Sequence, residues 1–252
     1  MMTFHIEHGV VTLSNLTALI DADIVAYRCS ASCQKQGVTN EPVEVATRRV
    51  DELMQRILHE TSSYDYQAFL TGSNNFRFKY NPEYKANRKD SVKPEWLEQC
   101  REHLVVQWKA SVTDGNEPDD EMAIAQTKDP ENTIICTIDK DLLQVPGKHY
   151  NFVKSEFRTI SPKEGLFNFY WQFIMGDVSD NIKGFDGLAR QTIPKKLNYL
   201  YEELQTTTMG TERDMFDVVQ AAYNDDKRLL MNGICLYMQR QPEEIWSFPN
   251  ET

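Results

Sequence analysis

The chain has 252 residues, of which 40% are hydrophobic, and its formal net charge is −11. This hydrophobic content is typical of a folded globular protein and excludes a disordered chain. No apolar run approaches the roughly 20 residues of a membrane-spanning helix, and residues 1–13 lack the features of a secretory signal, so we expect no membrane partner. The acidic composition, taken alone, argues against a nucleic-acid partner.

Three short apolar runs are predicted to form buried strands. They cover residues 16–20, 67–71 and 133–138. Apolar residues at helical spacing, or a proline at a helix start, predict helices between these strands. The helices cover residues 24–33, 42–60, 95–109 and 118–126. The order strand–helix–strand–helix–helix–strand is typical of an α/β layer with a mostly parallel sheet.

From Pro162 onward the apolar residues recur at helical spacing, which predicts a second part that is almost wholly helical. No linker of biased composition separates the two parts. We therefore place a soft boundary near residue 155, with an α/β core in residues 1–155 and a helical lobe in residues 156–252.

The cysteines give no sign of a disulfide framework or a zinc site. There are five, an odd number, and no C-x-x-C pair occurs among them. A reducing compartment, the cytoplasm, is the expected location.

Acidic residues cluster where predicted strands end and where helices begin. The clusters are Asp21 with Asp23; Glu117, Asp119 and Asp120; Asp139 with Asp141; and Asp177 with Asp180. Ligands of open parallel sheets bind at the carboxyl ends of strands, and carboxylate oxygens suit Mg²⁺ or Mn²⁺. Each cluster alone could be a helix cap or a turn, and Asp23 reads best as an N-cap. Four clusters in these places favour a metal site.

Residues 77–93 mix basic and aromatic side chains after the second predicted strand. Such a mixture suits a nucleic acid, whose phosphates pair with cations and whose bases stack on rings. The alternative is a solvated loop with its rings tucked beneath it. Further along, Gly184 and Gly187 could allow backbone N–H groups to hold a phosphate, although two glycines also occur in many ordinary turns.

Five sequence strings carry a resemblance to a known family. In chain order they read LIDADIVAYR, NPEYKANRK, NEPDDEMA, CTIDKDLLQV and GDVSDNIKGFDGL. Together they resemble the flap endonuclease and 5′–3′ exonuclease family, and most of all the exonucleases of short-tailed bacteriophages. The ordered motifs span residues 16–193, and the string LYMQRQPEEIWSFP near the end is also similar to those phage enzymes.

The resemblance implies a PIN-like α/β core, a helical arch over the active site at about residues 74–93, and a helix–three-turn–helix that grips duplex DNA. It implies metal-ligand roles for eight carboxylates and a catalytic role for two of them, Asp21 and Asp139. The eight are Asp21, Glu117, Asp119, Asp120, Asp139, Asp141, Asp177 and Asp180.

The resemblance also implies roles in DNA binding. Lys85 and Arg88 would contact the scissile phosphate, and Tyr84 would stack on the terminal base. The turn that begins at Lys183 would bind duplex phosphates, together with a monovalent cation held by backbone carbonyls. The turn's implied contacts are Lys183, Gly184, Gly187 and Arg190.

The chain departs from the family pattern in three places. Gly72 stands where the family usually has an aspartate after the second strand, so one carboxylate of the expected first metal site is missing. The second glycine and the lysine of the family's G-I-G-x-K turn are absent, and Arg190 supplies a charge one position early. The arch is also short, at about twenty residues.

We expect the chain to hydrolyse phosphodiester bonds by a two-metal mechanism with two Mg²⁺ or Mn²⁺ ions. The expected substrate is duplex DNA with a 5′ end or flap, or an RNA–DNA hybrid. We expect a monomeric protein in the cytoplasm of the infected host. The alternatives are a catalytically weakened nucleic-acid-binding protein and a PIN-like ribonuclease. The net charge does not exclude a nucleic acid, because eight of the acidic residues are assigned to the metal site.

Overall fold

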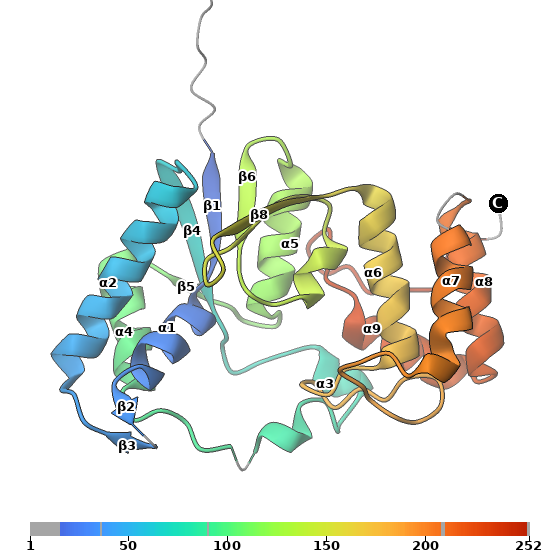
Figure 1. Ribbon diagram of the computed structural model, residues 1–252, viewed down its shortest axis with the longest axis horizontal. Helices are drawn as coiled ribbons and strands as arrows, with labels where there is room; N and C mark the ends of the chain where they lie inside the picture. Colours follow the sequence, from blue (N-terminus) through green and yellow to red (C-terminus); the bar gives the residue numbers. More distant parts are fainter. Residues whose placement is uncertain (1–15, 36, 90, 208–209, 251–252) are drawn as a thin grey trace, which may run out of the picture.

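The structure is a computed structural model that describes residues 16–35, 37–89, 91–207 and 210–250. At its centre lies a six-stranded sheet with the order β5-β4-β1-β6-β7-β8 (Figure 1). The strands are β1 (Thr17–Asp21), β4 (Asp65–Leu70), β5 (Ser111–Val112), β6 (Thr133–Cys136), β7 (Gly147–Asn151) and β8 (Glu156–Ile160). Only the β7–β8 pair is antiparallel, which confirms the mostly parallel sheet. A separate antiparallel pair joins β2 (Gln34–Lys35) and β3 (Val38–Thr39).

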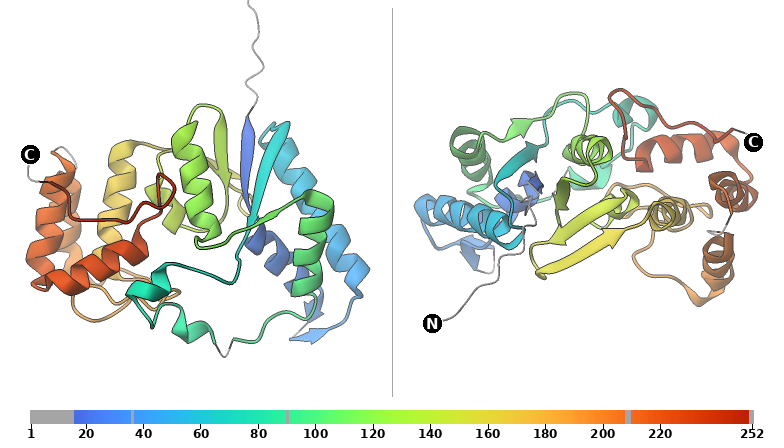
Figure 2. Two further views of the ribbon diagram at one scale, coloured as in Figure 1. Left: turned by 180° about the vertical axis from the view of Figure 1, so that it is seen from behind. Right: turned by 90° about the horizontal axis from the view of Figure 1, so that it is seen from above.

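Helices cover both faces of the sheet. One face packs against α1 (Ala22–Ala31), α2 (Val43–Glu60) and α4 (Leu97–Trp108), and the other packs against α5 (Pro118–Lys128). The alternation of side chains along β1 explains this arrangement, because Ala18 and Ile20 join the first core and Leu19 joins the second. The layers are seen end-on in the right-hand view of Figure 2.

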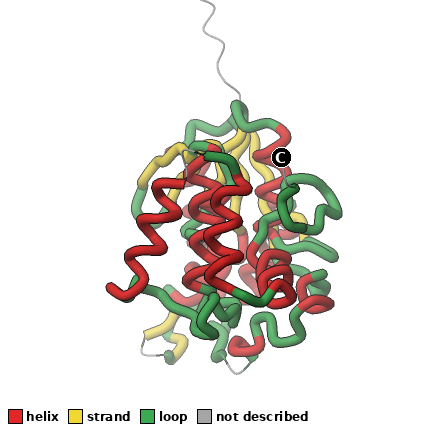
Figure 3. The backbone as a smooth tube through the Cα atoms, turned by 90° about the vertical axis from the view of Figure 1, so that its right-hand side faces the viewer, coloured by secondary structure: helices red, strands yellow, loops and turns green. Residues whose placement is uncertain are grey.

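The second part of the chain is helical, as predicted. It comprises α6 (Pro162–Met175), α7 (Asn198–Thr207), α8 (Glu212–Tyr223) and α9 (Asp226–Leu236), which stand together in front of the strands in Figure 3. Aromatic side chains such as Phe169, Phe173 and Trp246 fill the core between these helices. The boundary expected near residue 155 falls inside the β7–β8 pair, so the change from sheet to helices occurs after Ile160.

The end of the chain returns to the α/β core. Met238 packs between the sheet and α5, and Trp246 packs among the helices of the lobe. The left-hand view of Figure 2 shows this dark red segment crossing in front of α6. One segment thereby ties the two parts together. None of the described helices is long and apolar enough to cross a membrane.

The connection between β4 and α4 is not the helical arch that the family resemblance implies. In the described residues it contains α3 (Arg77–Tyr80), one 3₁₀ turn (Ala86–Arg88) and otherwise irregular chain (Figure 1). Pro82 cannot continue the helix beyond Tyr80, and Lys85 has a left-handed backbone with φ of 55°. These two residues explain why a continuous helix does not form there.

Candidate active site

The parallel strands β1 and β6 place two aspartates at one edge of the sheet. β1 ends at Asp21, and β6 ends three residues before Asp139. The carboxylate of Asp21 accepts hydrogen bonds from the backbone N of Ile24 (3.2 Å) and from Thr137 Oγ1 (2.8 Å). Asp21 is therefore the N-cap of α1, and the expectation that Asp23 has this role is wrong.

A cavity of about 190 Å³ lies at this edge. Its wall carries seven carboxylates from the end of β1 and the start of α1, the start of α5, the segment after β6 and the turn after α6. They are Asp21, Asp23, Glu117, Asp119, Asp139, Asp141 and Asp180. Lys85 and Arg88 line the same cavity. The fold thus brings six of the eight predicted metal ligands together with both residues predicted to contact the phosphate.

Burial and neighbouring aspartates raise the pKa values of three carboxylates of the wall. Burial raises the pKa of Asp21 to about 7, and the charges of neighbouring aspartates add to the effect. Burial also raises the pKa of Asp141 to about 8, with contributions from Asp139 and Asp177. The pKa of Asp119 is raised well above its usual value by burial and by Asp139. Like charges this close remain ionised at neutral pH only when a cation compensates them.

The chemistry of the wall suits divalent ions. Carboxylate oxygens are the hard ligands that Mg²⁺ and Mn²⁺ prefer. Among the described residues, no three acidic, histidine or cysteine side chains already surround one point as a ligand cage. Mg²⁺ keeps several of its waters and takes only one or two carboxylates directly. An open wall of carboxylates therefore fits ions that are held largely through water.

The two remaining predicted ligands lie outside the cavity wall. Asp177 is buried beside Asp141 and accepts a hydrogen bond from the backbone N of Asp180 (2.8 Å), so it sits directly behind the wall. Asp120 is different, because both of its oxygens bind the guanidinium of Arg77, at 2.6 and 2.8 Å. Asp120 is therefore committed to Arg77 and does not face the cavity.

Packing explains the glycine at position 72, where the family usually has an aspartate. A Cβ on Gly72 would lie 1.8 Å from the backbone carbonyl O of Thr113. The carboxylate found at this strand end is that of Asp23, which accepts a hydrogen bond from the backbone N of Thr71 (2.7 Å) and forms an ion pair with Arg101. Asp23 therefore brings a negative charge to the end of β4 from the neighbouring helix.

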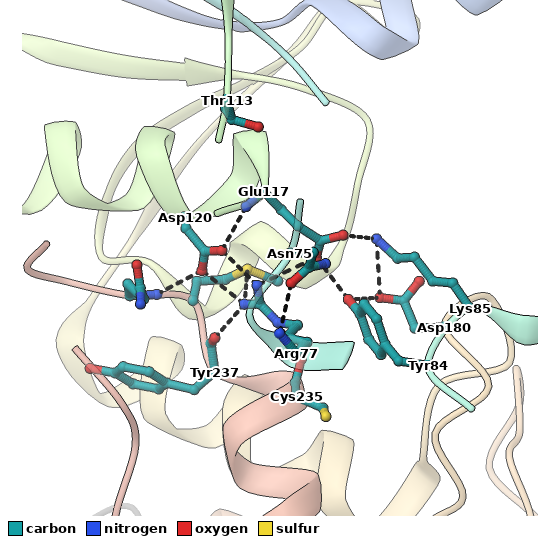
Figure 4. Close-up of polar contacts among 12 residues, drawn as sticks. Asn75, Arg77, Tyr84, Lys85, Thr113, Glu117, Asp120, Asp180, Cys235 and Tyr237 are labelled. Carbon is teal, nitrogen blue, oxygen red and sulfur yellow. Dashed lines mark hydrogen bonds and ion pairs between the residues drawn. The ribbon is translucent and has the colours of Figure 1, made fainter. Parts of the chain in front are cut away.

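Asp180 holds Lys85 and Arg88 at the cavity. Its backbone O accepts a hydrogen bond from the backbone N of Lys85 (2.9 Å), and its carboxylate lies 2.6 Å from Arg88 Nη2. The ammonium of Lys85 binds Glu117 and lies 3.7 Å from Asp180 (Figure 4). Arg88 Nε also donates to the backbone O of Ser179 (2.9 Å). Asp180, itself a carboxylate of the cavity wall, thus fixes the positive side chains of Lys85 and Arg88 beside the other carboxylates.

Tyr84 is not placed to stack on a nucleobase. Its side chain is 2% exposed, and its hydroxyl lies 2.7 Å from both Glu117 and Asp180 (Figure 4). The ring packs edge-on against Phe78. Burial, followed by the two carboxylates, raises the pKa of Tyr84 well above its usual value, so the hydroxyl remains a hydrogen-bond donor. The structure gives Tyr84 a supporting role in place of the predicted stacking role.

In the turn after α6, most of the residues predicted to contact DNA instead form hydrogen bonds or ion pairs within the protein. The backbone N of Gly184 donates to the carbonyl of Leu188 (2.9 Å), and the backbone N of Gly187 donates to the carbonyl of Gly184 (3.0 Å). Arg190 forms an ion pair with Asp186, and its side chain is only 10% exposed. Lys183 is exposed. In this conformation, only Lys183 among the predicted contacts presents an uncommitted group to a phosphate.

The charge pattern predicts that Arg77 belongs to an exposed basic surface, and this is wrong. Arg77 begins the basic segment, yet its side chain is completely buried between α5 and the end of the chain. Beside Asp120, it donates to the carbonyls of Cys235 (3.0 Å) and Tyr237 (2.8 Å). The spacing of Glu117 and Asp120 could have signalled the capping box that Asp120 completes at the start of α5.

Comparisons with known proteins show the family and the fold to which this chain is related. Residues 16–169 match the family model described as the 5′-3′ exonuclease, N-terminal resolvase-like domain. The fold resembles the bacteriophage T5 D15 protein co-crystallised with metal ions, with a TM-score of 0.63, 18% identity and 88% of each chain covered. It also resembles the T5 5′-exonuclease with bound zinc, with a TM-score of 0.60, 16% identity and coverage of 88% of this chain and 89% of that one.

A third solved structure is a T5 D15 flap endonuclease in a pseudo-enzyme–product complex with DNA and metal ions. Its TM-score is 0.51 at 17% identity, with 88% of this chain and 93% of that one covered. No curated protein matches the chain. The family model spans more than half of the chain, including the cavity carboxylates from Asp21 to Asp141. The chain therefore belongs to the 5′-3′ exonuclease family.

Proposed function

We propose that the chain hydrolyses phosphodiester bonds at 5′ ends or flaps of duplex DNA, with two Mg²⁺ or Mn²⁺ ions at the carboxylate cavity. The observation that carries this proposal is the convergence of seven carboxylates, Lys85 and Arg88 on one cavity at the carboxyl edge of the sheet. The T5 flap endonuclease in its complex with DNA and metal ions supports the choice of substrate.

We assign the carboxylates to two ions according to the acidic groups that neighbour one another. Asp119 interacts electrostatically with Asp139, Asp21 and Glu117, which we assign to one ion. Asp141 interacts with Asp139 and Asp177 on the other side, which we assign to the second ion. Asp139 neighbours both groups and would help to hold either ion. When bound, divalent ions lower the pKa of an attacking water and stabilise charge on the leaving oxygen.

The chain's own cations act on the substrate phosphate. Lys85 and Arg88 both lie beside Asp180, so a phosphate over the carboxylates would meet two positive groups from one side. These groups would orient the phosphodiester and stabilise the charge that develops on its oxygens. No side chain of the cavity is a cysteine, serine or histidine. This composition supports direct attack by water.

Cleavage of three 5′-labelled substrates tests the proposal: a flap, a blunt duplex and an RNA–DNA hybrid, each with Mg²⁺, with Mn²⁺ and with EDTA. We expect short labelled products from the DNA substrates with either metal ion, and none with EDTA. Binding without cleavage would favour the weakened nucleic-acid-binding protein, to which the glycine at position 72 points. Cleavage of the RNA strand alone would favour the PIN-like ribonuclease.

A further inference from the structure

Two further cavities continue from the active site along α1. A cavity of about 740 Å³ shares Asp23 and Ile24 with the carboxylate cavity. It shares Arg28 and Ser32 with a third cavity of about 480 Å³ between α1 and α2. The three cavities therefore follow one another along a single helix. The position of Arg28 is about 10 Å beyond Asp21 along the helix axis, given the rise of an α-helix.

The third cavity is lined by arginines. Arg49 and Arg56 are seven residues apart on α2, so they share one face of that helix, and Arg28 faces them from α1. Cys29 and Leu53 provide apolar surface beside them. We call this the arginine cavity. None of the five family-like sequence strings contains Arg49 or Arg56.

Two of the three arginines of the cavity carry a charge that no ion pair of the described residues neutralises. Arg49 forms an ion pair with Glu41 at 2.6 Å, and Glu52, which also lines the cavity, forms one with Arg48 at 3.5 Å. Among the ion pairs of the described residues, neither Arg28 nor Arg56 has a carboxylate partner. Arg56 donates one hydrogen bond, to the carbonyl of Phe152 (2.9 Å). A guanidinium has five N–H donors, so most donors of these two side chains remain available to an anion.

The arginine cavity lies on the opposite side of the molecule from the turn that follows α6. Figure 1 shows α1 and α2 at one end, and the connection between α6 and α7 at the lobe. A nucleic acid that enters from the lobe and reacts at the carboxylates would continue toward α1 and α2. The middle cavity has apolar side chains, including Tyr27 and Leu97, that suit bases. The phosphates would then reach the arginine cavity.

We propose that Arg28 and Arg56 form a phosphate-binding track for the single-stranded segment on the 5′ side of the scissile bond. This inference rests on the proposed function, since it takes the carboxylate cavity as the place of cleavage. Its ligand is a single strand of nucleic acid that is long enough to pass Arg28. A strand that ends at the carboxylates would not reach the track.

The test compares the variant Arg28→Gln/Arg56→Gln with the control Arg158→Gln, which changes an exposed arginine of β8 that lines none of the three cavities. Dissociation constants are measured in EDTA for duplexes with 5′ tails of about two and about twelve nucleotides. We expect the double variant to bind the long-tailed duplex about tenfold more weakly, with a shallower salt dependence, and the short-tailed duplex normally. The control should match the wild type on both.

Equal weakening for the two tail lengths, or no weakening, would overturn the track. So would inorganic phosphate that displaces the tail as effectively as an oligonucleotide of equal phosphate content, because the cavity would then be a site for free anions. Binding in EDTA does not require cleavage. A protein that shows the tail-length effect but cleaves no substrate would therefore retain the track and lose the proposed function.

Discussion

Arg77 and Asp120 form a fully buried, two-pronged ion pair, with Nη1–Oδ2 and Nη2–Oδ1 distances of 2.6 and 2.8 Å (Figure 4). Asp120 also accepts hydrogen bonds from the backbone N of Glu117 and of Gln239, both at 3.1 Å. The pair thereby joins the connection after β4, the start of α5 and the C-terminal segment. Since Glu117 and Asp119 lie at the start of α5, the pair positions two carboxylates of the cavity.

Removal of Arg77 should destabilise the fold strongly. Arg77→Met leaves Asp120 buried without its partner, and we expect the free energy of unfolding in urea to fall by about 3–5 kcal/mol. Arg158→Met, which removes an exposed arginine 3.9 Å from Glu164, should leave it nearly unchanged. The double variant Arg77→Met/Asp120→Leu should be more stable than Arg77→Met alone, because it buries no unpaired charge. A single variant as stable as the wild type would show that the pair contributes little.

Asp139 should be required for cleavage and dispensable for DNA binding. It faces both groups of carboxylates, so Asp139→Asn weakens both proposed ion sites while the surfaces that contact DNA are retained. We expect loss of cleavage by several orders of magnitude with a nearly unchanged dissociation constant for duplex DNA. Asp65→Asn, at the opposite end of the sheet, is the control. Equal loss of binding and cleavage would count against the assignment.

Stability should fall as the pH rises when no divalent ion is present. The pKa values of Asp21 and Asp141 rise from an ordinary 3.8 to about 7 and about 8 in the folded protein. At pH values between the ordinary and the raised pKa, the folded state binds more protons than the unfolded state. The free energy of unfolding therefore decreases as the pH rises through this range. Mg²⁺ should reduce this loss because it stabilises the ionised carboxylates. Urea unfolding in EDTA and in Mg²⁺ measures both effects, and a stability that rises with pH in EDTA would contradict the shifts.

Lys85 should act on turnover more than on substrate binding. Its ammonium contacts Glu117 and lies beside Asp180, at the point where charge develops on the phosphate. We expect Lys85→Ala to lower kcat by about a hundredfold or more, with a much smaller change in KM. Lys79→Ala changes an exposed lysine of the same connection and should have little effect on kcat. An unchanged kcat for Lys85→Ala would remove this residue from the mechanism.

The sequence reveals the sheet and most of the cavity because both depend on local patterns. Asp21 and Asp139 follow apolar runs, and parallel neighbouring strands necessarily bring such residues to one edge. The burial of a side chain by a segment that is distant in the sequence leaves no such local pattern. Arg77 and Tyr84 look like members of a basic, aromatic surface, yet the C-terminal segment and the helical lobe cover them. The position of Asp120 likewise depends on a partner 43 residues away.

Gly72 shows the same limit, since its role is to let two backbone segments approach closely. A Cβ at this position would lie 1.8 Å from the carbonyl O of Thr113, which is backbone and cannot rotate away. Gly72→Asp, the family-like residue, should therefore lower the free energy of unfolding by about 1–3 kcal/mol and should not increase cleavage. Gly72→Ala should be destabilising for the same reason, because the clash arises at Cβ. Ser73→Ala, at the exposed neighbouring position, should be neutral. Thermal unfolding and cleavage assays on the three variants distinguish the outcomes: a stable Gly72→Asp protein with higher activity would mean that the strand end can open to admit the missing ligand.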